Sequence, residues 1–383
     1  MSYDVIVIGT GTMGSAACAS LAGGGVNVLG LEQFSIPHDF GSHSGFTRII
    51  RQAYYEHPGY VPLLQRSYHL WNLLESDHKQ KIYHETGILY MGQTDSSVLT
   101  GTLKASQLYN IPVTQLPIQQ MTSDHHQFHI PSDWSLLWEP RSGYLDVNQA
   151  ISGFHQQALL AGATIHSGEK VESWNIENGQ VEVKTDRSTY QAKKLILTAG
   201  PWTQKVLAKA GLPLHVTRQV LAWVDVPETH PYSHPQFPCW FLHDPALGMF
   251  YGFPVSMTGN PDEPKGIKLA LHMPGTWTDP DQVDRQINYS DQAIVIDFIK
   301  KYMPELENQP VQYKTCMYTY TPDEHFILDY LPDCDKKVIL AAGFSGHGFK
   351  FAPVIGEILT NLYREKPSGF DLGFLSLRRF QAK

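Results

Sequence analysis

Residues 4–14 read DVIVIGTGTMG, an apolar, largely β-branched run that ends in a glycine-rich turn. The run is typical of a buried parallel strand, and the small residues at 15–21 favour a helix directly after the turn. Residues 26–31 (VNVLGL) predict a second strand, which ends at Glu32. This order of strand, glycine turn, helix, strand and acid predicts a dinucleotide site, whereas a glycine-rich turn alone would be weak support.

Each motif residue has a physical role in such a site. Gly9, Gly11 and Gly14 allow a tight turn and a close approach of the backbone to a pyrophosphate, which the amino terminus of the helix attracts. Glu32 is placed to accept hydrogen bonds from ribose hydroxyls. The pattern does not separate NAD from FAD, because both carry an ADP ribose and a pyrophosphate.

Composition excludes several protein classes. The 383 residues include 29 Lys and Arg against 37 Asp and Glu, a formal net charge of −8. Hydrophobic residues make up 42% and charged residues 17%, which argues against disorder. No apolar run approaches the roughly 18 residues of a membrane span. The acidic excess argues against a general nucleic-acid binder. We therefore expect neither a membrane nor a nucleic-acid partner.

The amino terminus and the cysteines bear on the compartment. A strand follows the first residues directly, with no signal-peptide pattern, so we expect a cytoplasmic protein. The four cysteines are scattered without CxxC spacing, which predicts reduced thiols and neither a disulfide framework nor a metal site. They are Cys18, Cys239, Cys316 and Cys334.

Helical periodicity recurs at wide intervals. It predicts helices over residues 60–77 and 147–160 and near 293–302. Between 82 and 146 the pattern predicts only short strands and loops, and the stretch 215–319 is rich in strands.

The α/β character of the opening segment returns twice. A strand at 194–197 runs into a turn that contains Gly200, and a strand at 338–340 runs into the glycine-rich segment 341–348. The nucleotide domain is therefore predicted to be discontinuous. A nicotinamide enzyme usually keeps this domain contiguous, so a flavin held between both chain ends explains the layout better.

Several separated motifs, in one order over nearly the whole chain, resemble those of the monomeric sarcosine oxidase family. This family of flavin-dependent amine oxidases also includes N-methyltryptophan oxidase. The motifs are GSHSGFTRIIRQAY (41–54), FYGFP (250–254), KLALH (268–272), KTCMYTYTPDEHFILD (314–329) and GFSGHGFKFAP (343–353).

The resemblance implies an FAD cofactor. It assigns the ADP portion to the glycine motif and Glu32, and a covalent bond from the flavin 8α-methyl group to Cys316. From the residues alone, a buried and inert thiol is the usual state of a lone cysteine. Forming the bond needs a thiolate, which nearby positive charge favours. Further cofactor-binding positions are Ser42, His43, Val171, Gly200, Gly346 and Gly348.

One departure concerns this attachment. The family commonly has two histidines before its arginines, but this chain has His43 and Ser44. An imidazole near the flavin is thus absent.

The resemblance also assigns the substrate carboxylate to Arg51 and Lys350 and places Arg48 beside the flavin. Arginine is the best bidentate donor to a carboxylate. On charge pattern alone, Arg48 and Arg51 are equally compatible with a solvated helix face. Lys350, between two phenylalanines, is also compatible with a lysine at the edge of the core.

Three more positions carry predicted catalytic roles. Lys268 lies in an apolar, alternating strand, where an inward charge is costly unless it is paired or functional. The resemblance places it opposite the substrate face of the flavin, where a cation stabilises charge as dioxygen is reduced. His272 shares a strand face with Lys268, which predicts one shared cavity. Tyr251 and His272 are expected to tune or position the amine.

The segment between Tyr251 and Lys268 is longer than in the family. Residues 256–265 predict an extra surface loop that reshapes the pocket entrance. We expect this loop, with Met249 and Phe250, to help select the substrate.

The sequence thus predicts an α/β protein with a discontinuous Rossmann-like FAD domain (1–82, 145–215 and 320–383) and a strand-rich antiparallel substrate domain (83–144 and 216–319). The expected function is oxidation of sarcosine or a related N-methyl amino acid, giving formaldehyde, the primary amino acid and hydrogen peroxide. Oxidation of N-methyltryptophan, of pipecolate or proline, a nicotinamide-dependent dehydrogenase and a non-catalytic flavin protein remain alternatives. The family suggests a monomer.

Overall fold

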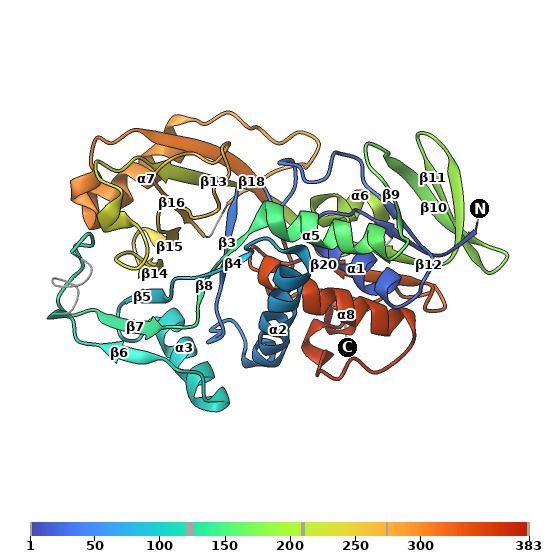
Figure 1. Cartoon of the computed structure of the whole chain (residues 1–383), viewed down its shortest axis with the longest axis horizontal. Helices are drawn as coiled ribbons and strands as arrows, with labels where there is room; N and C mark the ends of the chain where they lie inside the picture. Colours follow the sequence, from blue (N-terminus) through green and yellow to red (C-terminus); the bar gives the residue numbers. More distant parts are fainter. Residues whose placement is uncertain (1, 120–125, 208–210, 273–274, 381–383) are drawn as a thin grey trace.

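The computed structural model describes residues 2–119, 126–207, 211–272 and 275–380, and two large sheets dominate it (Figure 1). The first sheet has eight strands in the order β10-β11-β12-β1-β2-β9, with β20 beside β12 and β19 beside β20. Its strands are β1 (Ser2–Ile8), β2 (Val28–Leu31), β9 (Thr164–His166), β10 (Val171–Glu177), β11 (Gln180–Thr185), β12 (Thr189–Leu197), β19 (Ile327–Tyr330) and β20 (Val338–Ala342).

The opening strand β1 lies in the middle of this sheet. It pairs in parallel with β2 and with β12, and β12 pairs in parallel with β20. Val5, Ile6 and Val7 are fully buried, as expected for a parallel strand with both faces covered. Segments from both ends of the chain therefore meet in one sheet, which confirms the predicted α/β fold with a discontinuous, Rossmann-like nucleotide fold.

A group of helices packs beside this sheet (Figure 1). Its members are α1 (Thr12–Gly23), α2 (Val61–His78), α5 (Val147–Leu160) and α8 (Ala352–Tyr363). Helices α1 and α8 approach closely because Gly356 has no side chain: a Cβ there would lie 2.6 Å from the carbonyl oxygen of Ala16. Helix α5 begins at a cap in which the side chain of Asp146 accepts a hydrogen bond from the Gln149 backbone.

The second sheet has nine strands in the order β17-β13-β16-β15-β14-β5-β7-β6, with β18 paired to β13. All but the β5–β14 pairing are antiparallel. Its strands are β5 (Ile88–Gly92), β6 (Thr114–Leu116), β7 (Ser135–Glu139), β13 (His215–Val224), β14 (Cys239–Asp244), β15 (Gly248–Phe253), β16 (Ile267–Leu271), β17 (Thr276–Trp277) and β18 (Val311–Tyr320).

A small third sheet has the order β3-β8-β4. Its strands are β3 (Thr47–Ile50), β4 (Tyr83–Glu85) and β8 (Gly143–Asp146). Strand β3 contacts the short 3-10 helix η5 (Phe349–Phe351), and β18 contacts η2 (Gly200–Trp202). The strand-rich part and the nucleotide-type part of the chain therefore meet at β3 and β18. The predicted domain boundaries at residues 82, 144, 215 and 319 stay a prediction.

The predicted helices at 60–77, 147–160 and 293–302 correspond to α2, α5 and α7 (Tyr289–Tyr302). The short α6 spans Thr203–Leu207. The prediction of only strands and loops between 82 and 146 was wrong, because α3 spans Ser97–Tyr109. Its many Ser, Thr and Gly residues weaken the intrinsic helix signal, while a Ser96 cap and burial of Val98 and Leu99 stabilise the helix.

The helix-face alternative for the arginines was also wrong. Arg48 lies within strand β3 and Arg51 follows its last residue. Within the described ranges, no helix combines the length and the apolar character that crossing a membrane requires.

Candidate functional site

The glycine turn after β1 is shaped by close backbone packing. Gly9 has a φ of +86°, and a Cβ there would lie 2.8 Å from the Cα atom of Ala199. A Cβ on Gly14 would lie 1.9 Å from the carbonyl oxygen of Gly9. A Cβ on Gly11, by contrast, would have the His43 ring as its nearest neighbour, at 3.4 Å. Gly9 and Gly14 are thus required by close backbone packing within the turn. The backbone at Gly11 is not covered in this way and is accessible beside the His43 ring.

Glu32 holds this turn in place. Its carboxylate accepts hydrogen bonds from the backbone of Thr10 (3.0 Å) and Phe34 (3.1 Å). Burial raises the pKa of Glu32 to about 7, although these backbone hydrogen bonds oppose the shift. The neighbouring His38 lies 3.7 Å away, and burial lowers its pKa to about 4. At neutral pH a neutral imidazole and a half-ionised carboxyl group thus lie at this end of the site.

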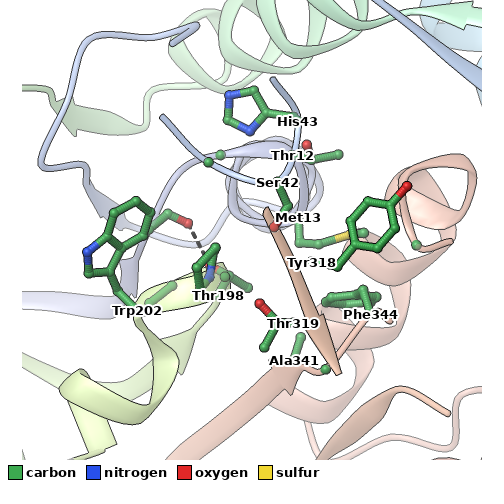
Figure 2. Close-up of a pocket in the computed structure, with 18 of the residues that line it drawn as sticks. Thr12, Met13, Ser42, His43, Thr198, Trp202, Tyr318, Thr319, Ala341 and Phe344 are labelled. Carbon is green, nitrogen blue, oxygen red and sulfur yellow. Dashed lines mark hydrogen bonds between the residues drawn. The ribbon is translucent and has the colours of Figure 1, made fainter. Parts of the chain in front are cut away.

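One continuous cavity of about 590 Å³ runs from the glycine turn to Arg51 and Lys350. Figure 2 shows Ser42 and His43 on one side of this space, near Thr12 and Met13, and Tyr318 and Phe344 on another. Most predicted site residues line it: Gly9, Gly11, Glu32, Ser42, His43, Arg48, Arg51, Val171, Gly200, Tyr251, His272, Gly346, Gly348 and Lys350.

The residues at the glycine end fit a dinucleotide. His43 is 7% exposed, and its Nε2 atom has no hydrogen-bond partner among the described residues. Burial lowers the pKa of His43 to about 3, so the ring is neutral and presents one N–H group. The hydroxyl of Thr10 is likewise buried and unpaired in the described part of the chain. Because Thr10 does not line the cavity, the groups that suit a pyrophosphate are the unpartnered His43 ring and the open backbone at Gly11.

The opposite end of the cavity holds a buried arginine. Arg51 is 1% exposed, and its Nη2 atom lies 2.6 and 2.7 Å from the two carboxylate oxygens of Glu56. Its guanidinium stacks over the rings of Tyr54 and Tyr55, 4.2 and 4.5 Å from their centroids. The charge of Arg51 is therefore fixed in position and satisfied by Glu56.

A buried lysine from the other end of the chain lies beside it. The Nζ atom of Lys350 donates to the carbonyl oxygen of His347 (2.9 Å) and lies 3.4 Å from the Tyr54 hydroxyl. Burial, assisted by the nearby charge of Arg51, lowers the pKa of Lys350 to about 7. Lys350 thus changes its charge near neutral pH.

Arg48 is held by backbone oxygens. It donates to the carbonyl groups of Ser42 (3.0 Å), Ser44 (2.5 Å) and Thr47 (2.8 Å). No acidic side chain in the described ranges pairs with it. Its charge is therefore stabilised by dipoles and is free to act on a group bound in the cavity.

Lys268 and Cys316 are buried but do not line the main cavity. Lys268 donates to the carbonyl oxygen (2.9 Å) and the hydroxyl (3.2 Å) of Thr47. Because His272 does line the cavity, the prediction of one space shared by Lys268 and His272 was wrong: the Lys268 ammonium points at strand β3 instead. Strand β16 lies between β13 and β15, so the alternative of a solvated edge lysine is also excluded.

The Cys316 thiol is 1% exposed on β18. Burial raises its pKa, while the positive charges of Arg48, Lys268 and Arg285 oppose that shift. Ser44 donates a hydrogen bond to the carbonyl oxygen of Thr315 (3.0 Å). The segment before Arg48 is thereby tied to the strand that carries the thiol.

His272 and Tyr251 form an aromatic wall. The ring centroid of His272 lies 5.9 Å from that of Tyr251 and 5.8 Å from that of Tyr318. The two tyrosine hydroxyls are 3.4 Å apart. Burial lowers the pKa of His272 to about 3, so this wall is uncharged at neutral pH.

The predicted selectivity elements lie elsewhere. The sulfur of Met249 accepts a hydrogen bond from the Tyr55 hydroxyl, and Phe250 stacks on Phe298, 4.2 Å between centroids. Neither lines the main cavity, and nor does any residue of the loop 256–265. The loop instead borders a second, smaller cavity. The prediction that it reshapes the entrance of the main cavity was wrong, because no loop residue lines that cavity and the Met257 backbone instead donates to the Tyr144 hydroxyl.

Several lining residues were not predicted. The most informative are Glu56, Thr198, Trp202, Tyr318 and His347. Trp202 and His347 lie in the glycine-containing segments that follow β12 and β20, and Tyr318 lies two residues beyond Cys316, so proximity to these motifs is a usable signal. Glu56 carries no such signal, because an acid five residues after Arg51 resembles a surface pair. Within the described residues, no group of three or more His, Cys, Asp or Glu side chains is arranged to hold a metal.

Comparison with known proteins agrees with this geometry. The family described as FAD dependent oxidoreductase matches residues 4–362. A monomeric sarcosine oxidase from Bacillus sp. (strain NS-129) is 36% identical, covering 98% of this chain and 97% of its own. An N-methyl-L-tryptophan oxidase from Yersinia pestis (strain Pestoides F) is 32% identical and matches over the full length of both chains. The nicotinamide alternative is thereby overturned.

Solved structures give the same result for the fold. NikD, an unusual amino acid oxidase essential for nikkomycin biosynthesis, superposes with a TM-score of 0.83 at 26% identity, over 98% of this chain and 97% of its own. An L-proline dehydrogenase from P. horikoshii has a TM-score of 0.84 at 22% identity, over 99% and 98% of the two chains, which supports the fold alone. The chain belongs to the FAD-dependent oxidoreductases, in the group that contains monomeric sarcosine oxidase and N-methyl-L-tryptophan oxidase.

Proposed function

We propose that this protein oxidises the N-methyl group of sarcosine or of a related N-methyl amino acid. The carbon–nitrogen bond becomes an imine, which water hydrolyses to formaldehyde and the primary amino acid. FAD, when bound, accepts a hydride from the substrate and passes two electrons to dioxygen, giving hydrogen peroxide. The observation that carries the proposal is the pair of buried cations, Arg51 and Lys350, at one end of the cavity.

These two cations suit the carboxylate of an amino acid. A planar guanidinium binds a carboxylate through two parallel hydrogen bonds, and its low exposure strengthens the contact. Glu56 contacts Arg51 through Nη2 alone, and the Nε atom of Arg51 has no partner among the described residues. A substrate carboxylate therefore displaces or shares this partner, and the second cation, Lys350, favours the exchange.

The uncharged wall suits the amine. His272 is neutral because burial lowers its pKa to about 3. A neutral imidazole and the Tyr251 hydroxyl orient a secondary amine without repelling its charge. Anchoring of the carboxylate then fixes the N-methyl group in one place, which favours transfer from its carbon.

We assign Lys268 and Arg48 to the reaction with dioxygen. Reduction of dioxygen develops negative charge, which a fixed cation in a buried site stabilises. Lys268 is 2% exposed, and Arg48 is held by three carbonyl groups. Lys268 acts on charge through space, because it lies behind the cavity wall.

We also propose that Cys316 bonds covalently to the flavin. Burial raises the pKa of the thiol, and the positive charges of Arg48, Lys268 and Arg285, which oppose that rise, support the proposal. The remaining cofactor contacts are assigned to the lining residues Ser42, His43, Val171, Gly200, Gly346 and Gly348. The predicted monomer is supported by the names of the sarcosine oxidase relatives. The predicted cytoplasmic location is consistent with four free cysteines in the described structure.

A substrate panel tests the function. The purified yellow enzyme is mixed, without oxygen, with sarcosine, N-methyl-L-tryptophan, L-proline and L-pipecolate, and bleaching of the flavin absorbance is recorded. Peroxide and formaldehyde are then measured in air. Bleaching by sarcosine or another N-methyl amino acid, with formaldehyde formed, supports the proposal. Bleaching only by a cyclic amino acid, or by none of the four, overturns it.

A further inference from the structure

Trp223 lines a second cavity of about 350 Å³, and the Lys268 ammonium, which does not line that cavity, lies against the same indole ring. The Lys268 ammonium lies 5.3 Å from the centroid of the Trp223 ring, and the two residues are paired across strands β13 and β16. Trp223 also lines the second cavity, together with residues of the loop 256–265. One indole ring therefore contacts both the proposed oxygen-activating cation and the cavity that the loop 256–265 borders.

The loop brings a carboxylate to this cavity. The Oε2 atom of Glu263 accepts a hydrogen bond from the Thr258 hydroxyl (2.7 Å), which fixes the orientation of the side chain. The Oε1 atom is buried and has no partner among the described residues. The Nε1 atom of Trp223, a residue only 1% exposed, is also unpartnered within those residues. A buried acceptor and a buried donor, both without a partner in the described part of the chain, thus belong to residues that line this cavity.

Lys268 needs a source of negative charge. Its direct partners are two neutral oxygens of Thr47 and the faces of the Phe253 and Trp223 rings. In the described structure, no carboxylate lies within ion-pair distance of it. Burial lowers the pKa of Lys268 well below its usual value, and the charge of Arg48 adds to this effect. A neutral lysine would not stabilise negative charge on oxygen.

The charged and titratable groups around Lys268 come from three elements. Arg48 on β3 and Lys314 on β18 disfavour its protonated form, and the Cys316 thiol on β18 favours it when ionised. Glu263 on the loop also favours the protonated form. Because burial raises the pKa of Cys316, this thiol is neutral near pH 7. Of these groups, Glu263 is the carboxylic acid that favours the protonated form of Lys268.

We propose that Glu263 is a positioning residue for the oxygen half of the reaction: across Trp223, its carboxylate supplies the counter-charge that keeps Lys268 protonated. The inference rests on the role assigned to Lys268 under the proposed function. Under this proposal the loop 256–265 helps to keep Lys268 protonated, whereas the sequence predicted a role in substrate selection.

Titration of Lys268 tests the proposal without turnover. The holoenzyme is labelled with lysine carrying ¹³C at Cε, the Lys268 signal is assigned by its loss in Lys268→Met, and its shift is followed with pH. In Glu263→Gln the midpoint falls by about one pH unit, as for removal of a nearby opposite charge. Asp262→Asn, which removes the neighbouring exposed carboxylate of the same loop, leaves the midpoint in place. Glu263→Asp keeps the charge and most of the wild-type midpoint.

Reoxidation provides the functional readout. The flavin is reduced with dithionite, so that no amine is needed, and is mixed with oxygenated buffer across the same pH range. In Glu263→Gln, the pH at which the reoxidation rate declines moves down by the same amount as the NMR midpoint. When Glu263→Gln is added to Lys268→Met, the reoxidation rate does not change further.

Two failures are distinguishable. An unchanged midpoint in Glu263→Gln, or an equal shift in Asp262→Asn, overturns the inference and leaves the oxidase function standing. Absence of oxidation of any amino acid overturns the proposed function, while the dithionite experiment still reports on Glu263.

Discussion

Arg51 and Glu56 form a mostly buried ion pair at the end of the cavity. The guanidinium Nη2 atom lies 2.6 and 2.7 Å from the two carboxylate oxygens. The side chains of the two residues are 1% and 14% exposed. A buried pair of this kind is costly to break by removing one partner, because the other charge remains without compensation. An incoming carboxylate avoids that cost where it shares the guanidinium with Glu56, so that neither Arg51 nor Glu56 loses its partner.

Replacement of Arg51 by glutamine should weaken binding of the amino acid much more than it slows reoxidation. Hydrogen bonds to charged groups contribute about 1.5–3 kcal/mol, so the dissociation constant should rise about tenfold to a hundredfold. Perturbation of the flavin spectrum during titration with the substrate identified by the panel, without oxygen, measures it. Arg66→Gln, which opens an exposed ion pair with Glu357, is the matched control and should change nothing. Equal affinity in both variants would refute the role of Arg51.

Affinity for a simple carboxylate should depend on the charge of Lys350. Its pKa is lowered to about 7 by burial, so Lys350 is protonated below that pH and neutral above it. The dissociation constant of propionate, read from the flavin spectrum, should therefore be lowest below pH 7 and rise with pH above it. The neighbouring His272 does not interfere, since its pKa is lowered to about 3.

Two variants separate Lys350 from other titrating groups. Lys350→Met should bind propionate weakly at every pH. Lys350→Arg should remove the decline in propionate affinity above pH 7, because arginine stays charged. If the decline persists in Lys350→Met, another group controls binding.

The sequence predicted the tight glycine turn because its determinants are local, while the assignment of this turn to the cofactor stays a prediction. Gly9, Gly14 and Glu32 act within one strand-turn-helix-strand unit, and their spacing encodes the contacts that the structure shows. Arg51 and Lys350 come from opposite ends of the chain, so no local pattern predicts that they share a site. Only the resemblance to a family predicted it, and both residues line one cavity in the structure.

The errors arose where a contact depends on a distant element. Alternation in β16 correctly predicts that Lys268 points inwards, but it does not show that Thr47 of β3 meets the ammonium there. The loop 256–265 likewise has a composition that predicts surface exposure, while its location beside Trp223 is set by the order of strands in the second sheet.

A methyl group added to Gly14 should abolish flavin incorporation. The Cβ of alanine would lie 1.9 Å from the carbonyl oxygen of Gly9, a contact between two backbone segments that cannot be relieved by a side-chain rotation. Gly23→Ala, in the same helix, meets no atom within 4 Å and should retain a full complement of flavin. The ratio of flavin to protein absorbance after purification checks both variants. Normal flavin content in Gly14→Ala would show that the glycine turn is not the cofactor site.

Removal of the Cys316 sulfur should convert a covalent flavin into a dissociable one. Burial raises the pKa of both thiols, but three cations, Arg48, Lys268 and Arg285, oppose the rise at Cys316. At Cys239 the pKa reaches about 12, and Lys268 is the one cation among the described residues that opposes the rise. After acid precipitation the yellow colour should stay with the pellet for the wild type and for Cys239→Ala, and pass into the supernatant for Cys316→Ala. Release from the wild type would contradict covalent attachment and leave FAD bound only by the cavity. Since Ser44 replaces the family's second histidine, retention would also show that these three cations suffice without that imidazole.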